Sequence, residues 1–421
     1  MTRPSRLGVA WTAGRLATRR LLRREVGDRD LELGELLTGQ LDEMKGLAMK
    51  VGQIVSYLDV PLPDPVQAQL ARLQTGTGGM PPDETRAVVE GALGATVEEL
   101  FERFDFEPVA AASIGQVHRA RVGGRQVAVK VQYPEVAGSF AADLGALDGV
   151  AGLASLASAV DGRAIVRELA ARLEEECDYT REAAMQRAFA ARFHDDPRVV
   201  VPDVLVERSA EKVLTSAWLE GRAFADLPRD TSPEERGELA ATLIRFSYRS
   251  LLGFGAIQAD PHPGNFLFLE DGAVGFLDFG CVRELDAWMV EAQRELVTAV
   301  RHDDRPRFRA AVEALGMVGD ARRFDFDHFF LVMAHLHRPF TVPRFHFTRG
   351  YVTEGYALNS ATSPNARTLS LPPAAIWVMR LQWGLWSMLA RLDAEGPFAA
   401  ILDEVLDDAP LATTSRAEAQ A

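Results

Sequence analysis

Hydrophobic and polar positions follow two different periods in the first third of the chain. Between residues 28 and 93 the apolar residues recur at helical spacing, and a proline-rich run (61–65), a glycine-rich run (75–79) and Pro81–Pro82 interrupt them. Helices are therefore predicted over 28–58, 64–73 and 83–93. After Phe106 the period changes to two, and β-branched runs on either side of Gly123 and Gly124 predict a hairpin and a third strand.

The remainder of the chain is predicted to be mainly helical, with two short β segments. The pattern predicts a long helix over 141–193, a strand pair over 199–207 and 212–220, a helix over 232–253, a hairpin around Asp271 and Gly272, helices to about residue 407, and an irregular tail. This order predicts an α+β fold with five segments: a basic segment (1–34), a helical extension (35–105), a sheet-containing lobe with a helical insertion (106–220), a helical lobe (221–407) and a tail (408–421).

Charge is distributed unevenly along the chain. Residues 1–24 hold seven arginines and no acidic residue, whereas the whole chain has 46 basic and 60 acidic residues and a net charge of −14. An acidic body argues against a nucleic-acid partner, because such binding needs clustered Lys and Arg. The basic segment fits either a helix lying on an anionic membrane surface or a solvated terminus, and the sequence leaves both open.

Cysteine content and hydropathy indicate the cellular setting. Two cysteines, Cys177 and Cys281, exclude a disulfide framework and a four-cysteine zinc site, which fits a cytoplasmic protein, either free or peripheral to a membrane. The most apolar late stretch, 374–390, is shorter than the roughly 20 residues that span a bilayer and has Arg380 and Gln382 at its centre. A buried helix is therefore expected there.

The strongest chemical signal lies between residues 258 and 280. Asp260 and Asn265 are separated by four residues, and Asp278-Phe279-Gly280 follows on the predicted hairpin. Phosphoryl transfer needs one carboxylate to orient or deprotonate the acceptor, and an amide oxygen with a second carboxylate to hold Mg²⁺. We assign the first role to Asp260 and the second to Asn265 and Asp278. An ordinary turn, which also favours Asp and Asn, is the alternative.

Lys130 lies in VAVK, an apolar strand in which a charged side chain is unexpected. A strand lysine taken alone is usually a solvated edge residue. The loop at 258–280 favours another interpretation, in which Lys130 reaches the phosphates of a nucleotide and a glutamate on a helix fixes it.

These signals together resemble the UbiB/AarF family of atypical kinases, whose eukaryotic members support coenzyme Q biosynthesis. The resemblance covers about residues 35–400 and implies a bilobal protein-kinase-like fold, an N-terminal helical extension with a K-x-G-Q motif, and ATP and Mg²⁺ as cofactors. It also implies that the extension folds over the active site, with Lys50 near Glu176. The matching residues are Lys50 and Gln53 of K-x-G-Q, Ala110, Ala111, Ala112 and Ser113 of an alanine-rich nucleotide loop, Glu176 and Asp178 of E-x-D, and Glu182 as the partner of Lys130.

The residues in these motifs add physical expectations. Alanines restrict the positive φ and the close backbone approach that glycines allow, so the loop at 110–112 should grip phosphates differently from an ordinary kinase. On one continuous helix, Asp178 and Glu182 would share a face. One departure from the family is the missing C-terminal pair of membrane-spanning helices, so that any membrane attachment would be peripheral.

Three functions follow from these expectations. The first is an atypical kinase or ATPase that acts on a small or lipid-derived partner, such as an isoprenoid-quinone precursor. The second is a nucleotide-gated lipid-binding protein, and the third is a pseudokinase scaffold.

Overall fold

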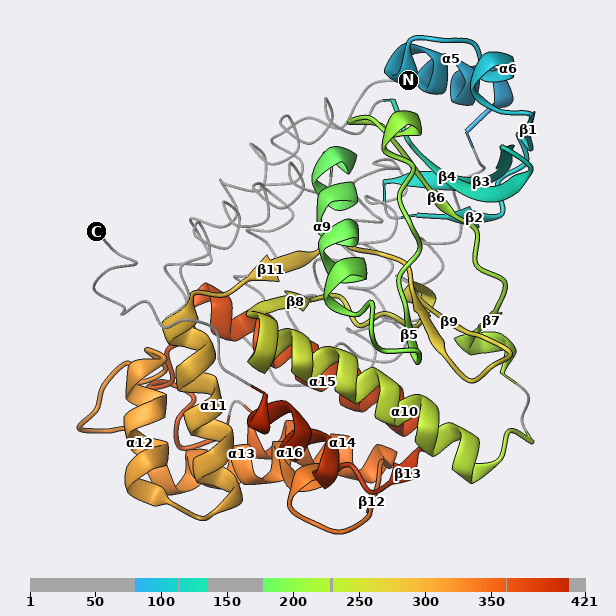
Figure 1. The fold of residues 1–421 in the computed structure, drawn as a ribbon. Helices are drawn as coiled ribbons and strands as arrows, with labels where there is room; N and C mark the ends of the chain where they lie inside the picture. The colour runs from blue at the N-terminus through green and yellow to red at the C-terminus, as the bar shows by residue number, and fades with distance from the viewer. Residues whose placement is uncertain (1–79, 113, 135–176, 228–229, 361, 409–421) are drawn as a thin grey trace, which may run out of the picture. The chain divides into compact units, whose positions relative to one another are not determined.

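The computed structural model describes residues 80–112, 114–134, 177–227, 230–360 and 362–408 (Figure 1). They belong to two compact units. The first unit includes the residues up to Ala183 together with Val204–Trp218, and the second includes Ala184–Asp203 and the chain from Leu219 onward. Residues 184–203, which the sequence analysis assigned to the sheet-containing lobe, thus cluster with the helical unit. The K-x-G-Q segment, Glu176, the basic segment and most of the tail lie outside the described residues.

The first unit is built on a five-stranded sheet. Its central strands β3 (Gly115–Val122) and β4 (Arg125–Gln132) form the predicted hairpin, with Gly123 and Gly124 at φ of 56° and 75°. Such left-handed turns match the twist of the paired strands. The other strands are β1 (Arg103–Phe104) and β2 (Ala110–Ala111), which pair with opposite ends of β3, and β6 (Val213–Ala217), which pairs with β4.

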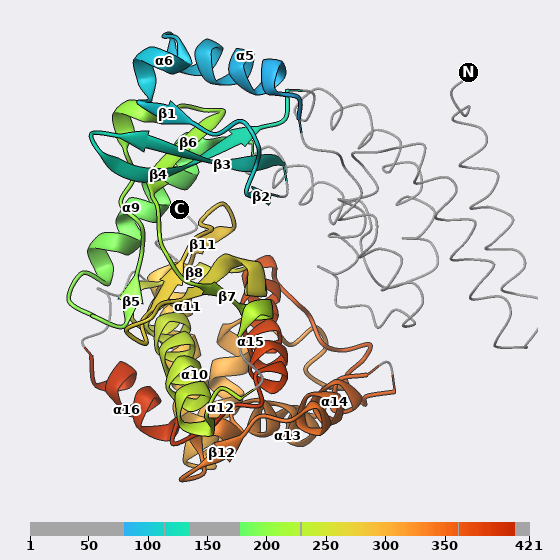
Figure 2. The same ribbon diagram turned by 90° about the vertical axis from the view of Figure 1, so that its right-hand side faces the viewer.

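Alternation along β4 gives the sheet two different faces. Val127, Val129 and Val131 are buried on one face, where they pack with residues of the helices α5 (Pro82–Leu93) and α6 (Val97–Leu100). Figure 2 shows these two helices over one side of the sheet. The predicted helix over 83–93 is confirmed by α5. Because side chains alternate between faces, Lys130 points the other way.

A buried polar network attaches α5 to the sheet. The Gln116 side chain accepts a 2.8 Å hydrogen bond from the Met80 N–H and donates one of 3.0 Å to the Thr85 hydroxyl. His118 donates from Nδ1 to the Asp105 carbonyl at 2.9 Å, so its Nε2 accepts from Gln116. Burial lowers the pKa of His118, which keeps the ring neutral for this arrangement.

The second unit is mostly helical. Its helix α10 (Pro233–Tyr248) starts at Ser232, whose hydroxyl accepts from the Glu235 N–H, and continues into a π-helical turn, η3 (Arg249–Phe254). In Figure 1, α11 (Ala287–Arg301) and α12 (Arg305–Ala314) lie side by side. The remaining helices are α13 (Phe326–Leu336), α14 (Arg349–Leu358), α15 (Pro373–Arg391) and α16 (Ala399–Asp407), with short 3₁₀ turns η2 (Phe224–Asp226), η4 (Pro263–Asn265) and η5 (Arg338–Phe340).

Helix α15 lies in the core of this unit. Trp377, Trp383 and Trp386 are all buried in one large apolar cluster, which confirms the buried helix predicted over 374–390. Fully burying side chains of this size contributes about 2 kcal/mol or more each. In the part of the chain that the structure describes, no helix is both long enough and apolar enough to cross a membrane.

Short sheets complete the second unit. The predicted hairpin is present as β9 (Phe266–Phe268) and β10 (Val274–Phe276), with Gly272 at φ 83° in its turn. Their four-stranded sheet also contains β5 (Val199–Val200) and β7 (Arg222–Ala223), and the two-stranded sheets pair β8 (Ala256–Gln258) with β11 (Val282–Glu284) and β12 (Phe345–His346) with β13 (Glu395–Gly396).

Two predicted elements were wrong. The strand predicted over 212–220 is present as β6, but its predicted partner over 199–207 is not one strand, because β5 pairs with β10 in the second unit. The segment meets β6 through the Val204–Ser216 bridge and the Leu205 N–H, which donates to the Thr215 carbonyl at 2.9 Å. Pro202 removes a donor between these two regions, and the 3₁₀ turn η1 (Val206–Arg208) ends the segment. The long helix predicted over 141–193 is also interrupted, because residues 177 and 178 are not helical and α9 comprises Tyr179–Arg192.

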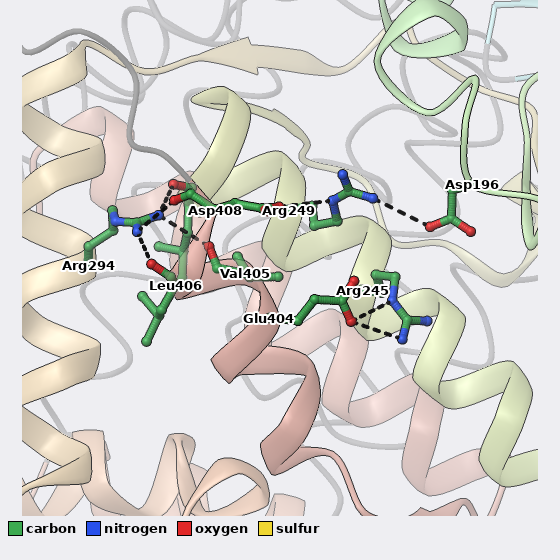
Figure 3. Close-up of polar contacts among 9 residues, drawn as sticks. Asp196, Arg245, Arg249, Arg294, Glu404, Val405, Leu406 and Asp408 are labelled. Atoms are coloured by element: carbon green, nitrogen blue, oxygen red, sulfur yellow. Dashed lines mark hydrogen bonds and ion pairs between the residues drawn. The ribbon is translucent and has the colours of Figure 1, made fainter.

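Arginines fix the last helix, α16, to the rest of its unit (Figure 3). Arg294 of α11 donates to the carbonyls of Val405, Leu406 and Asp408 at the end of α16, and to the Leu252 carbonyl in the π-helical turn. A buried cation at a helix C-terminus pairs with carbonyls that have no partner within the helix. Arg245 of α10 adds an ion pair with Glu404.

Candidate functional site

Lys130 and Glu182 form a nearly buried ion pair in the first unit. The Lys130 ammonium lies 2.9 Å from each carboxylate oxygen of Glu182, and the two side chains are 14% and 3% exposed. The Tyr179 ring, 5.0 Å from the ammonium, faces the same cation. Strand β4 and the first turn of α9 therefore bring together the two residues that the sequence analysis paired.

The alanine-rich segment forms an edge of the same sheet. Ala110 and Ala111 make up β2 and are exposed, and the Ala112 N–H donates to the Gly115 carbonyl at 2.8 Å to close the turn into β3. Ser113 lies outside the described residues. A short turn with exposed small residues leaves the backbone accessible to a ligand.

Gly115 was missed by the sequence analysis. A Cβ at this position would lie 2.2 Å from the Val131 carbonyl oxygen and 2.9 Å from the Tyr179 hydroxyl, so no other residue fits without displacing backbone. The signal in the sequence was its place, three residues after Ala112, at the end of the alanine-rich segment.

Asp178 lies in a different setting from the one predicted. Its Oδ1 accepts a 2.9 Å hydrogen bond from the Thr180 N–H and bonds with the Thr180 hydroxyl, so Asp178 caps the start of α9 instead of sharing a helical face with Glu182. The cap uses one of its two oxygens. Lys50, Gln53 and Glu176, the other residues predicted in this group, lie outside the described residues.

The loop that carries Asp260 and Asn265 follows β8 in the second unit. The Asn265 side chain donates from Nδ2 to the Asp260 carbonyl at 3.0 Å and reaches Asp260 Oδ2 at 3.5 Å. Arg380 of α15 forms a 2.6 Å ion pair with Asp260 Oδ1. The structure thus brings Asp260 and Asn265 together, and it adds Arg380, which the sequence analysis used only as evidence against a membrane span.

Asp278 is held in register with this loop. Phe266 and Phe276 are cross-strand partners, and the Leu277 N–H donates to the Asn265 carbonyl at 3.0 Å, so Asn265 and Asp278 lie at the same end of the β9–β10 hairpin. The Gln258 side chain donates to the Asp278 carbonyl. Gln258 is a further residue that the sequence analysis missed.

Phe279 fixes the following turn. It is 1% exposed, and its ring lies 5.1 Å from that of Phe189, on the half of α9 that belongs to the second unit. The Asp278 Oδ1 accepts from the Gly280 N–H at 3.0 Å. A buried phenylalanine on one side and a capped turn on the other limit the positions open to the Asp278 side chain.

The oxygens of this hairpin suit a hard cation. Because Asn265 uses its amide nitrogen toward Asp260, the amide oxygen remains an acceptor, and Asp278 supplies a carboxylate. Carboxylate and amide oxygens are the ligands that Mg²⁺ prefers. These residues therefore fit the cation that the sequence analysis assigned to them.

Comparison with known proteins gives the same family for the chain. The model of the ABC1 atypical kinase-like domain matches residues 72–312. The atypical kinase COQ8 of Saccharomyces cerevisiae is 34% identical over 275 residues (64% of this chain, 54% of that protein), and COQ8 of Schizosaccharomyces pombe is 32% identical over 315 residues (73% and 50%). The chain thus spans about half the length of these relatives.

A solved structure is similar over nearly its whole length. The complex of Rv3197 with erythromycin, from Mycobacterium tuberculosis, is 32% identical, with a TM-score of 0.67 over 90% of this chain and 97% of that one. The family model covers more than half of the chain, and the motifs of the sequence analysis lead to the same family. The chain belongs to the UbiB/AarF family of atypical kinases, which carry the ABC1 atypical kinase-like domain.

Proposed function

We propose that this chain is an ATP-binding, Mg²⁺-dependent atypical kinase or ATPase. The observation that carries the proposal is the Lys130–Glu182 pair, because an ammonium held by both oxygens of a buried carboxylate is oriented for a phosphate rather than left in solvent. A purely structural ion pair at this depth brings little stability over apolar residues, so its presence favours a functional role.

The proposal gives each predicted site residue a role. Lys130 binds the nucleotide phosphates and Glu182 holds it; Asn265 and Asp278 hold Mg²⁺; Asp260 orients or deprotonates the acceptor. When bound, Mg²⁺ neutralises charge on the transferring phosphoryl group. The alanine-rich residues 110–113, with Lys50, Gln53, Glu176 and Asp178, complete the proposed nucleotide site, and the bilobal arrangement remains part of this proposal.

We further propose that the acceptor or partner is small or lipid-derived. Support comes from the resemblance, which implies a role in quinone biosynthesis, and from the COQ8 relatives. An isoprenoid-quinone precursor is the first candidate, and water is the acceptor if the protein is an ATPase. Peripheral contact with a membrane through the basic segment, which lies outside the described residues, belongs to the same proposal.

A second candidate is a nucleotide-gated binding protein that transfers no phosphoryl group to an acceptor. The observation that favours it is the likeness to Rv3197, which was solved with erythromycin, a large and mostly apolar ligand. In this version ATP changes the affinity for a lipid or a macrolide. A pseudokinase scaffold is a third version, and the presence of every predicted ATP and metal residue argues against it.

The test is Mg²⁺-dependent ATP loss by the purified chain, measured alone and with anionic liposomes, a prenylated phenol or erythromycin. Asp278→Asn should abolish turnover. Asp271→Asn is the matched control, because Asp271 lies exposed in the turn of the same hairpin, where its carboxylate accepts a 3.0 Å hydrogen bond from the Ala273 N–H. Turnover that Asp278→Asn leaves unchanged refutes the mechanism.

The products separate the candidates. A phosphorylated phenol supports a kinase, and phosphate release alone supports an ATPase. ATP that alters ligand affinity without any phosphorylated acceptor supports the gated binding protein. Absence of both nucleotide binding and turnover supports the scaffold.

A further inference from the structure

Helix α15 places a guanidinium on the loop that carries Asp260. Arg380 bonds from Nη2 to Asp260 Oδ1 at 2.6 Å and from Nε to the Ala259 carbonyl at 2.9 Å. The guanidinium therefore contacts the backbone before Asp260 and the carboxylate itself. A planar group with two fixed donor directions specifies the orientation of a carboxylate, which a flexible ammonium does not.

The other side of Asp260 is also held. Asn265 contacts the Asp260 carbonyl and, at 3.5 Å, Oδ2, while the His262 N–H donates to the same carbonyl at 2.7 Å. The contact to Oδ2 is long, so Arg380 makes the short bond to this carboxylate. Removal of Arg380 takes a hydrogen bond from the Ala259 carbonyl, which loosens the loop although its other backbone contacts remain, and it frees the side chain of Asp260 to turn.

A second observation on α15 is independent of charge. Gly384 lies four residues after Arg380, hence on the same face of the helix. A Cβ at Gly384 would lie 2.5 Å from Cγ of Pro261, the residue that follows Asp260. The helix thus approaches the loop so closely that only glycine fits.

From these contacts we infer that Arg380 is a positioning residue for Asp260, and that α15 fixes the position of the loop that carries Asp260. The inference rests on the proposed function, because it gives Arg380 a role in the reaction through Asp260. Loss of the pair lets the carboxylate leave its productive orientation, and a displacement of about 1 Å in a reacting group lowers turnover by about 100-fold. Nucleotide affinity should stay unchanged, because Arg380 is proposed to act through Asp260 and the Ala259 carbonyl, and neither of these residues is assigned to the nucleotide.

The first experiment compares the kinetics of arginine variants of the full chain. Arg380→Ala should lower kcat by about 30- to 100-fold and leave KM for ATP within about twofold. Arg380→Lys should recover only part of kcat, because an ammonium cannot make both bonds in one geometry. Methylguanidinium at non-denaturing concentration should restore Arg380→Ala in a saturable manner. Arg391→Ala is the control, since exposed Arg391 on the same helix stacks on Phe224 and should keep wild-type turnover.

Gly384→Ala separates positioning from stability. The helix propensity that alanine gains over glycine, about 1 kcal/mol, offsets part of the cost of the contact with Pro261, so the melting temperature should change little, while displacement of Pro261 lowers kcat. Unchanged kcat in both Gly384→Ala and Arg380→Ala overturns the inference. A fall in melting temperature that accompanies every loss of kcat, with no rescue by methylguanidinium, assigns Arg380 a structural role and overturns it too.

Amide hydrogen exchange over residues 259–266 distinguishes this inference from the proposed function. Arg380→Ala should speed exchange there and leave α12 unchanged. If the wild-type chain shows no ATP turnover but the variant shows this local effect, the proposed function fails and the positioning contact stands. If turnover is present and neither exchange nor kcat responds, the positioning inference alone fails.

Discussion

Glu182→Gln tests the Lys130–Glu182 pair most directly. The change keeps the size and one hydrogen-bond acceptor but removes the charge that faces Lys130 at 2.9 Å. Breaking a fully buried pair costs about 3–5 kcal/mol. Because Lys130 retains 14% exposure, we expect a cost below this range, about 2–3 kcal/mol.

The measurement is thermal unfolding combined with a double-mutant cycle. A loss of about 2–3 kcal/mol should lower the melting temperature of the affected transition by about 5–10 °C in a unit of this size. Lys130→Met should destabilise similarly, since it leaves Glu182 buried without its partner. The double variant Lys130→Met with Glu182→Leu should recover most of the stability, because apolar residues of similar volume replace a buried pair at little cost.

ATP turnover in the same variants separates function from stability. Both single variants and the double variant should lose Mg²⁺-dependent turnover, even though the double variant is stable. Lys212→Met is the control, because Lys212 is exposed in the turn that precedes β6 of the same sheet. An unchanged melting temperature in Glu182→Gln would refute the energetic reasoning, and turnover in the stable double variant would refute the role of the pair.

Two further predictions concern Gly115 and His337. Gly115→Ala should lower both the free energy of unfolding and the affinity for ATP, because the added Cβ would lie 2.2 Å from the Val131 carbonyl oxygen. The control is Gly91→Ala, which should stabilise α5 by up to about 1 kcal/mol, because a Cβ there would have no atom within 4 Å. Equal melting temperatures for the two variants would contradict this prediction. Burial lowers the pKa of His337 from 6.5 to about 4. Between pH 6.5 and 4 the unfolded chain therefore binds a proton at this residue and the folded chain does not, so the free energy of unfolding should fall by about 1.4 kcal/mol for each unit by which the pH is lowered. His337→Gln should flatten this part of the stability–pH curve, and an unaltered slope in that variant would contradict the argument.

Local patterns were sufficient where one segment determines its own structure. The hairpin around Gly272 and the start of α10 at Ser232 depend on a turn glycine and a helix cap, and both are readable in a few residues. The apolar run VAVK likewise predicted the strand on which Lys130 lies, β4. The family pattern, rather than the local one, supplied Glu182 as its partner.

Predictions failed where the local structure depends on residues far away in the sequence. Residues 199–200 have the same β preference in either pairing, and they pair with residues of β10 that lie 75 positions further along the sequence, instead of with β6. The helix predicted over 141–193 was extended through Asp178, because Asp178 is both a plausible helix residue and a good cap and periodicity does not distinguish the two. Gly115 and Gln258 were missed because their roles depend on backbone atoms of other strands.

Helix α15 shows why a charge in an apolar stretch needs a tertiary explanation. Arg380 and Gln382 argued against a membrane span, and a buried polar group also requires a partner, but the sequence does not say which one. In the structure Gln382 donates to the Tyr248 hydroxyl and Arg380 to Asp260, residues more than 100 positions away. The helix therefore supports the core through Trp386 and contacts the loop through Arg380, so a substitution in it can change turnover, stability or both. Melting temperature and kcat must accordingly be measured on the same preparations before a loss of activity in any α15 variant is assigned to the orientation of Asp260.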